Sequence, residues 1–312
     1  MSKAPRDLPA SVRQRLLNLA QAQQEDFGYV LTRYALERLL YRLSCSPQRE
    51  RFVLKGALLF QVWTPKPNRR TRDLDLLGQG ENTPARLVRI FQDLCRQPVE
   101  ADGLEFVTDS VRAEPTQTDQ VYAGLRVQLE ALLARARIAL QIDIGFGDVI
   151  TPQALEITYP TLLDFPAPRL RAYPPETVVA EKFQAMVVLG MANSRMKDLY
   201  DLWVLAQEFE FAGPVLSQAL AQTFQQRQTP LPAPTLLALS VAFAEDQTKQ
   251  RQWQAFLHQG RLTAEGPELA AVITTLRAFL LPPVAALIAG QPFPQHWASA
   301  GPWKPLRKKP RP

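Results

Sequence analysis

Apolar residues recur at three- and four-residue intervals near both ends of the chain, a spacing typical of amphipathic helices. The expected helices span residues 8–25, 28–45, 84–96, 173–189 and 196–209, with further helix and linker from residue 214 onward. The longest apolar run, residues 269–289, is interrupted by Arg277 and by Pro282-Pro283. We therefore expect a buried helix there rather than a membrane span.

Between these helices, short apolar or alternating runs predict strands. The expected strands span residues 52–54, 73–77, 104–112, 121–133 and 136–146, and a short helix over 57–63 follows Lys55-Gly56. Strands grouped inside helical flanks indicate an α+β fold, with a small mixed sheet flanked by helices and a helical C-terminal domain. The expected segments are N-terminal helices (1–48), a core (49–172), a helical domain (173–290) and a basic, Pro-rich, disordered tail (291–312).

Two carboxylates lie in the apolar strand Asp73-Leu74-Asp75-Leu76-Leu77. Because successive strand residues point to opposite faces, Asp73 and Asp75 share one face and the leucines between them the other. Adjacent carboxylates repel each other, and burial penalises the charged form further. A hard, oxygen-preferring cation such as Mg²⁺ would relieve both costs.

A second acidic strand, residues 138–145, alternates isoleucine and leucine with polar residues and places Asp143 on its polar face. A third carboxylate on a neighbouring strand would complete a two-cation site for phosphate chemistry. Taken alone, an Asp-x-Asp pair is more often a solvated strand edge or a turn. Three aspartates within strands are harder to attribute to chance.

Composition bears on nucleic-acid binding, disulfide bonds, zinc binding and localisation. The formal net charge of +6 falls to about +1 without the basic tail, so charge gives little support to a nucleic-acid footprint. With two cysteines and two distant histidines, neither a disulfide framework nor a zinc site is expected. The first twenty residues lack the apolar core of a signal peptide, so we expect a cytoplasmic protein with no membrane association.

Five segments in order resemble the AbiEii/AbiGii toxin family of nucleotidyltransferases, within the polymerase-β-like nucleotidyltransferase superfamily. They are residues 52–59 (FVLKGALL), 70–76 (RTRDLDL), 141–148 (QIDIGFGD), 181–186 (EKFQAM) and 195–202 (RMKDLYDL). The resemblance covers about residues 50–206. The Asp-x-Asp motif alone has little specificity, whereas the five segments in sequence are specific.

The resemblance implies transfer of a nucleoside monophosphate from an NTP to a hydroxyl acceptor, with two Mg²⁺ ions. In toxins of this kind the acceptor is typically the 3′ end of tRNA. The resemblance also implies the toxin of a toxin–antitoxin or phage-defence system, with a cognate antitoxin encoded nearby.

The resemblance assigns roles to particular residues. Those with an implied catalytic role are Asp73, Asp75, Asp143, Lys182 and Asp198, of which the first three would hold metal. Those with an implied nucleotide-binding role are Lys55, Gly56, Ala57, Arg72, Lys182 and Asp201. The superfamily's usual Gly-Ser is Gly56-Ala57 here, so backbone amides and Lys55 would take over phosphate contacts from the missing hydroxyl.

Other interpretations stay open. Lys182 could be a solvated helix position, and Asp198 could simply stabilise a helix start. The same site could serve a protein or small-molecule acceptor. A non-catalytic module that kept the fold and binds NTP or RNA is the alternative from another class.

Overall fold

The computed structural model describes residues 7–64, 69–116, 124–233, 236–260, 262 and 266–306. The chain forms two compact units. The first contains residues 1–147 and 155–173, and the second contains residues 148–154 and 174–312. The chain therefore passes from one unit to the other three times.

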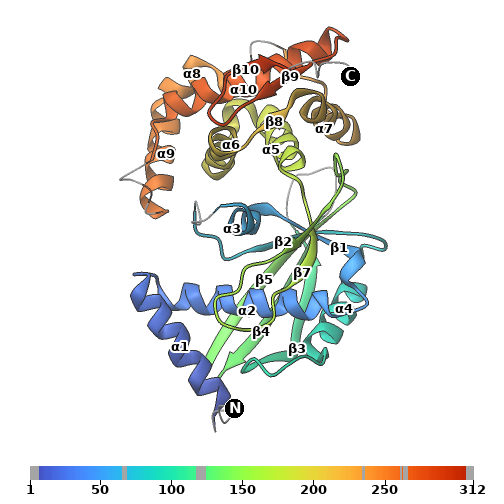
Figure 1. Ribbon diagram of the computed structural model, residues 1–312, viewed down its shortest axis with the longest axis vertical. Helices are drawn as coiled ribbons and strands as arrows, with labels where there is room; N and C mark the ends of the chain where they lie inside the picture. Colours follow the sequence, from blue (N-terminus) through green and yellow to red (C-terminus); the bar gives the residue numbers. More distant parts are fainter. Residues whose placement is uncertain are drawn as a thin grey trace, which may run out of the picture. The chain divides into compact units, whose positions relative to one another are not determined.

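Across the described residues, the first unit contains a mixed sheet in the order β3-β4-β5-β2-β1-β7-β6 (Figure 1). Its strands are β1 (Phe52–Lys55), β2 (Leu74–Gly78), β3 (Leu104–Pro115), β4 (Leu125–Leu133), β5 (Ala136–Phe146), β6 (Leu155–Thr158) and β7 (Arg169–Ala172). The pairs β2–β5 and β1–β7 are parallel, and the other neighbours are antiparallel. The mixed sheet of the predicted α+β fold is thus confirmed.

The sequence pattern did not predict strands β6 and β7. Strand β6 lies at the edge of the sheet and has little burial, and in β7 only alternate residues are buried. Neither strand therefore has a strong apolar pattern in the sequence. The strand expected over 121–133 is observed from Leu125, and residues 117–123 lie outside the described residues. Strand β3 extends to Pro115, beyond the expected residue 112.

Helices of the first unit lie beside this sheet, with α2 running across it (Figure 1). They are α1 (Leu8–Ala22), α2 (Phe27–Ser44), α3 (Phe60–Trp63) and α4 (Pro84–Arg96), with 3₁₀ turns η1 (Arg49–Arg51) and η2 (Gly56–Leu59). Asp7 and Asp26 cap α1 and α2 through their side chains. Because α2 contacts β5 and β7, the N-terminal helices belong to the core unit instead of forming the separate segment expected over 1–48.

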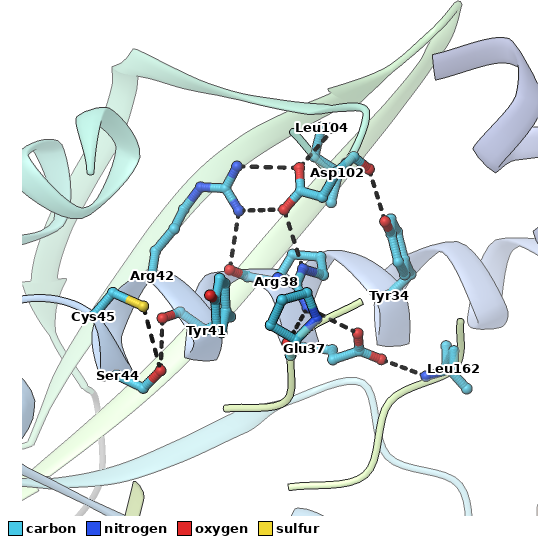
Figure 2. Close-up of polar contacts among 11 residues, drawn as sticks. Tyr34, Glu37, Arg38, Tyr41, Arg42, Ser44, Cys45, Asp102, Leu104 and Leu162 are labelled. Carbon is cyan, nitrogen blue, oxygen red and sulfur yellow. Dashed lines mark hydrogen bonds and ion pairs between the residues drawn. The ribbon is translucent and has the colours of Figure 1, made fainter. Parts of the chain in front are cut away.

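A buried polar network attaches α2 to the chain around it (Figure 2). Asp102 accepts hydrogen bonds from Arg38 Nε at 3.1 Å and from Arg42 Nη1 at 2.7 Å. Arg38 is 0% exposed and Asp102 1% exposed, so this is a desolvated ion pair. Tyr34 donates to the Asp102 carbonyl oxygen at 2.7 Å. The loop before β3 is thereby held on α2 by charge as well as packing.

Glu37, also in this network, accepts a hydrogen bond from the backbone N–H of Leu162 at 2.7 Å. Burial raises the pKa of its carboxyl to about 7, against the lowering effects of this hydrogen bond and of Arg38. Below pH 4.5 the carboxyl is protonated in both folded and unfolded chains. Between pH 4.5 and 7 the folded chain binds more of this proton.

We therefore expect stability to fall as pH rises through that window and to level off above it, by at most about 3 kcal/mol. Urea unfolding at pH 5 and pH 7.5 measures the change, and Glu37→Gln is the comparison. The wild-type chain should lose more stability than the variant between the two pH values. Equal losses would contradict a raised pKa at Glu37.

The second unit is mostly helical and includes a small antiparallel sheet, β10-β9-β8 in the described residues (Figure 1). Its helices are α5 (Pro175–Leu189), α6 (Met196–Glu208), α7 (Gly213–Gln226), α8 (Val241–Glu245), α9 (Gln247–Gln259) and α10 (Leu269–Ile288), with 3₁₀ turns η3 (Gly190–Ala192) and η4 (Leu237–Leu239). Its strands are β8 (Phe211–Ala212), β9 (Gln295–Trp297) and β10 (Trp303–Pro305). The predicted C-terminal helical region is confirmed.

The expectation of a disordered tail from residue 291 is wrong for the part that is described. Trp297 is 2% exposed and donates from Nε1 to the Ala206 carbonyl at 2.8 Å. Trp303 stacks on Phe279 of α10, with ring centroids 6.0 Å apart. Large aromatic side chains bury enough apolar surface to order a Pro-rich segment. Residues 307–312 lie outside the described residues.

Helix α10 is, among the described residues, the one helix long and apolar enough to cross a membrane by length and composition. Its buried residues include Leu276, Phe279 and Leu280, and Phe279 contacts Phe211 and Trp297. These side chains pack inside the second unit, and one such helix is weak evidence for a membrane protein.

Candidate active site

The two acidic strands are neighbours in the sheet. Strand β2 pairs with β5 in parallel, and Asp75 is the register partner of Asp143. Register partners project from the same face, so the two carboxylates lie side by side. The apolar residues Leu74, Leu76, Ile142 and Ile144 are 0–1% exposed on the opposite face. Alternation on both strands therefore sends the leucines and isoleucines into the core and the aspartates outward.

The row of charge extends over four adjacent strands. Lys55 at the end of β1 is the partner of Asp75, and Arg126 on β4 is the partner of Asp143. The order across the sheet is thus Lys55, Asp75, Asp143, Arg126, with the two anions flanked by two cations. The Lys55 ammonium also lies 5.3 Å from the centre of the Tyr173 ring.

Asp73 is placed differently from the expectation. Strand β2 begins at Leu74, so Asp73 precedes the strand rather than lying within it, and its side chain is exposed. The backbone N–H of Asp73 donates to Thr71 Oγ1 at 3.4 Å. Its spacing from Asp75 still favours the same side of the chain.

Asp143 is held by Arg126 in a two-pronged ion pair. Nε donates to Oδ1 at 2.7 Å and Nη2 to Oδ2 at 3.0 Å. This geometry matches the fork of a guanidinium to both oxygens of a carboxylate. The hydrogen bond to Asp143 raises the pKa of the Arg126 guanidinium, and the charges of Asp143, Asp73 and Glu114 raise it further. Sequence reasoning missed Arg126.

Gly56 allows Asp75 its position. Its φ is +75°, and a Cβ built there would lie 2.0 Å from Asp75 Oδ2. The carboxylate thus packs against the bare Cα where the 3₁₀ turn η2 begins, with Ala57 buried as its next residue. Only glycine combines this backbone with so close an approach.

Gly56→Ala should therefore displace the Asp75 carboxylate, in addition to a backbone cost of about 1–2 kcal/mol. If Asp75 is catalytic, we expect at least a roughly 100-fold loss of nucleotide transfer, because a shift of about 1 Å suffices for that. Gly290→Ala is the matched control: its φ is +63°, and among the described residues no atom lies within 4 Å of the added Cβ. Transfer rate and thermal unfolding of both variants are the measurements. Equal activity in the two would contradict the role of Gly56.

Lys182, Asp198 and Asp201 form a separate cluster within the second unit. The Lys182 ammonium on α5 lies 2.5 Å from Asp198 Oδ1 and 2.9 Å from Asp201 Oδ2 on α6. The three side chains are 14%, 12% and 1% exposed, respectively. The ammonium is thus engaged by two carboxylates, and Lys182 is not the solvated helix position considered as an alternative. Asp198 also lies in the first turn of α6, where the helix dipole favours an anion.

Arg72 is exposed, and its guanidinium lies 3.2 Å from Asp26, the residue that caps α2. It is 64% exposed, so solvent screens this pair.

Carboxylate oxygens are the ligands that Mg²⁺ prefers, and Asp73, Asp75 and Asp143 provide such oxygens on neighbouring positions. Among the described residues, however, no three His, Cys, Asp or Glu side chains are grouped closely enough to hold a metal ion. The donor chemistry therefore fits the ion, while the pairing of Asp143 with Arg126 would have to open for three carboxylates to share it.

A mixed sheet with paired acidic strands, followed by a helical domain, is the architecture that the sequence led us to expect of a nucleotidyltransferase. Residues 38–275 match the family model described as "Nucleotidyl transferase AbiEii toxin, Type IV TA system". Since the match covers most of the chain, the protein belongs to this family. It is accordingly a nucleotidyltransferase of a type IV toxin–antitoxin family, a class that uses an NTP and is paired with a cognate antitoxin.

Two solved structures from Helicobacter pylori are similar. JHP933 has 15% identity and a TM-score of 0.49, with 84% of this chain and 97% of that chain covered. A second protein, assigned provisionally as a nucleotidyltransferase, has 14% identity and a TM-score of 0.48, with 85% and 98% covered. No curated protein matches the chain.

Proposed function

We propose that this protein transfers a nucleoside monophosphate from an NTP to a hydroxyl at the 3′ end of tRNA, releasing pyrophosphate, in a Mg²⁺-dependent reaction. The observation that carries the proposal is the alignment of Asp75 with Asp143, with Asp75 packed against the bare Cα of Gly56, in a chain that belongs to this family. Blocking the tRNA end would account for toxicity in a toxin–antitoxin or phage-defence system.

Each residue has a role that its surroundings support. Gly56 lets Asp75 pack against the start of η2, where the backbone would bind the triphosphate, and Lys55, two strands from Asp143, adds positive charge on the same face. Asp73 and Asp75 would hold a divalent ion, which when bound neutralises charge on the triphosphate. Asp143 would accept the proton of the acceptor hydroxyl or share the ion.

The surroundings of Lys182 suggest more than direct binding of a phosphate by its ammonium group. Its charge is already shared by Asp198 and Asp201, so the trio carries a net negative charge. We propose that Asp198 and Asp201 position the ammonium for use of the NTP. Arg72, which is exposed, would contact triphosphate or RNA after leaving Asp26.

The test is incubation of the purified protein with each α-³²P-labelled NTP, Mg²⁺ and total tRNA. Label that migrates with tRNA supports the proposal, provided that no label is incorporated when the 3′ end of the tRNA has been oxidised with periodate before the reaction. Label on protein would redirect it to a protein acceptor. If the protein binds NTP but no label is incorporated with any NTP, a non-catalytic module is favoured. The missing serine at Ala57 supports that alternative.

A further inference from the structure

Arg126 binds the carboxylate of Asp143, which a second divalent ion would need as a ligand. Both Asp143 oxygens accept from its guanidinium, at 2.7 Å and 3.0 Å. A carboxylate bound in this way has its charge compensated and its best lone-pair directions in use. The arrangement therefore already contains a cation at Asp143.

This pairing is a property of the sheet, because Arg126 and Asp143 are register partners on adjacent antiparallel strands. Cross-strand neighbours are held in reach of each other by the backbone ladder. The side chains are 36% and 27% exposed, so water and ions can reach the pair. The Arg126–Asp143 pair can therefore open and exchange its partner, unlike the buried ion pairs of Asp102, whose side chains are 0–7% exposed.

We propose that Arg126 is the resident cation of Asp143 in the metal-free protein and competes with a divalent ion for that carboxylate. Binding of the ion at Asp143 then requires the guanidinium to swing away. Arg126 thereby sets the metal affinity of the site and keeps the adjacent anions Asp75 and Asp143 compatible in its absence. The inference rests on the proposed function, since it takes Asp143 as part of the metal site.

Mn²⁺ binding to the full-length protein, without NTP or tRNA, tests this directly. Free Mn²⁺ is counted by its electron paramagnetic resonance signal during a titration of wild type and Arg126→Gln. Removing the competing cation should tighten Mn²⁺ binding by roughly tenfold, the scale of a lost charge-assisted hydrogen-bond pair. Arg126→Lys keeps the charge but loses the fork, so its affinity should lie between the two.

Arg137→Gln is the matched control. Arg137 lies on β5, next to β4, and donates to Glu130 at 2.6 Å in a pair of its own, with its side chain 70% exposed. Its removal takes away the same charge from the same pair of strands and should leave Mn²⁺ affinity within twofold of wild type. A similar gain in Arg137→Gln would show a general charge effect and would overturn the inference.

The outcomes separate this inference from the function on which it rests. If neither wild type nor Arg126→Gln binds Mn²⁺, the metal-dependent proposal fails and the inference fails with it. If wild type binds Mn²⁺ but Arg126→Gln binds it equally or more weakly, the inference alone is overturned and Arg126 supports the Asp143 geometry instead. Should Arg126→Gln not fold, Arg126→Lys decides by the same criterion, tighter binding than wild type being required.

Discussion

Asp75→Asn is expected to lower nucleotide transfer by about 10³-fold or more, with a melting temperature within a few degrees of wild type. The change keeps the shape of the side chain against Gly56 and removes only its charge. If Asp75 holds the ion that neutralises the triphosphate, the loss corresponds to about 4 kcal/mol of transition-state stabilisation. Initial rates with labelled NTP and tRNA, and thermal unfolding, provide the two readouts.

The matched control for this experiment is Asp93→Asn. Asp93 lies on α4 of the same unit, with its side chain 72% exposed. Its loss of one negative charge should change neither rate nor stability measurably. Full activity of Asp75→Asn would remove Asp75 from the catalytic machinery and leave the proposed function without its main support.

Asp102→Ala is expected to destabilise the first unit by about 3–5 kcal/mol, the usual result of removing one partner of a buried ion pair. Arg38, 0% exposed, and Arg42, 6% exposed, would lose their shared counter-charge. The backbone N–H of Leu104 would also lose its acceptor, 3.1 Å away. For a unit of this size the loss corresponds to a fall in melting temperature of roughly 10 °C.

Asp164→Ala serves as the control, because Asp164 pairs with Arg15 at 3.4 Å and its side chain is fully exposed. An ion pair at the surface contributes little, so this variant should melt with wild type. Calorimetry of both proteins is the measurement. If Asp102→Ala melted within 2 °C of wild type, the network of Figure 2 would not be a major source of stability.

Local sequence patterns were sufficient for much of the carboxylate site. Alternation in the segment around Asp75 predicted that Leu74 and Leu76 are buried and that Asp75 faces the other way, and both leucines are 1% exposed. The same argument placed Asp143 on the polar face of its strand. Arg126 could also have been found, because counting outward from the two-residue turn Ala134-Arg135 pairs Arg126 with Asp143.

Local patterns failed where the partner lies far away in the chain. Asp102 stands in a short loop and carries no sign of burial, yet α2 covers it with two arginines. Lys182 could be interpreted as a solvated or a phosphate-binding residue, and its pairing with Asp201 depends on how α5 packs on α6. The tail was expected to be disordered because proline and charge dominate its composition, whereas Trp297 and Trp303 order it through contacts with residues nearly a hundred positions away or on α10.

By itself, the sequence determined the fold class, the first five strands and their order along the chain, the faces of Asp75 and Asp143, and the family. Period-two alternation and segment order are properties of neighbouring residues, so they can be seen without coordinates. The tertiary structure alone decided that β2 pairs with β5 in parallel, that Asp73 precedes its strand, and that Asp102 pairs with Arg38 and Arg42. Parallel pairing and ion pairing join residues far apart in sequence, and their energies depend on distances that only the packed chain defines.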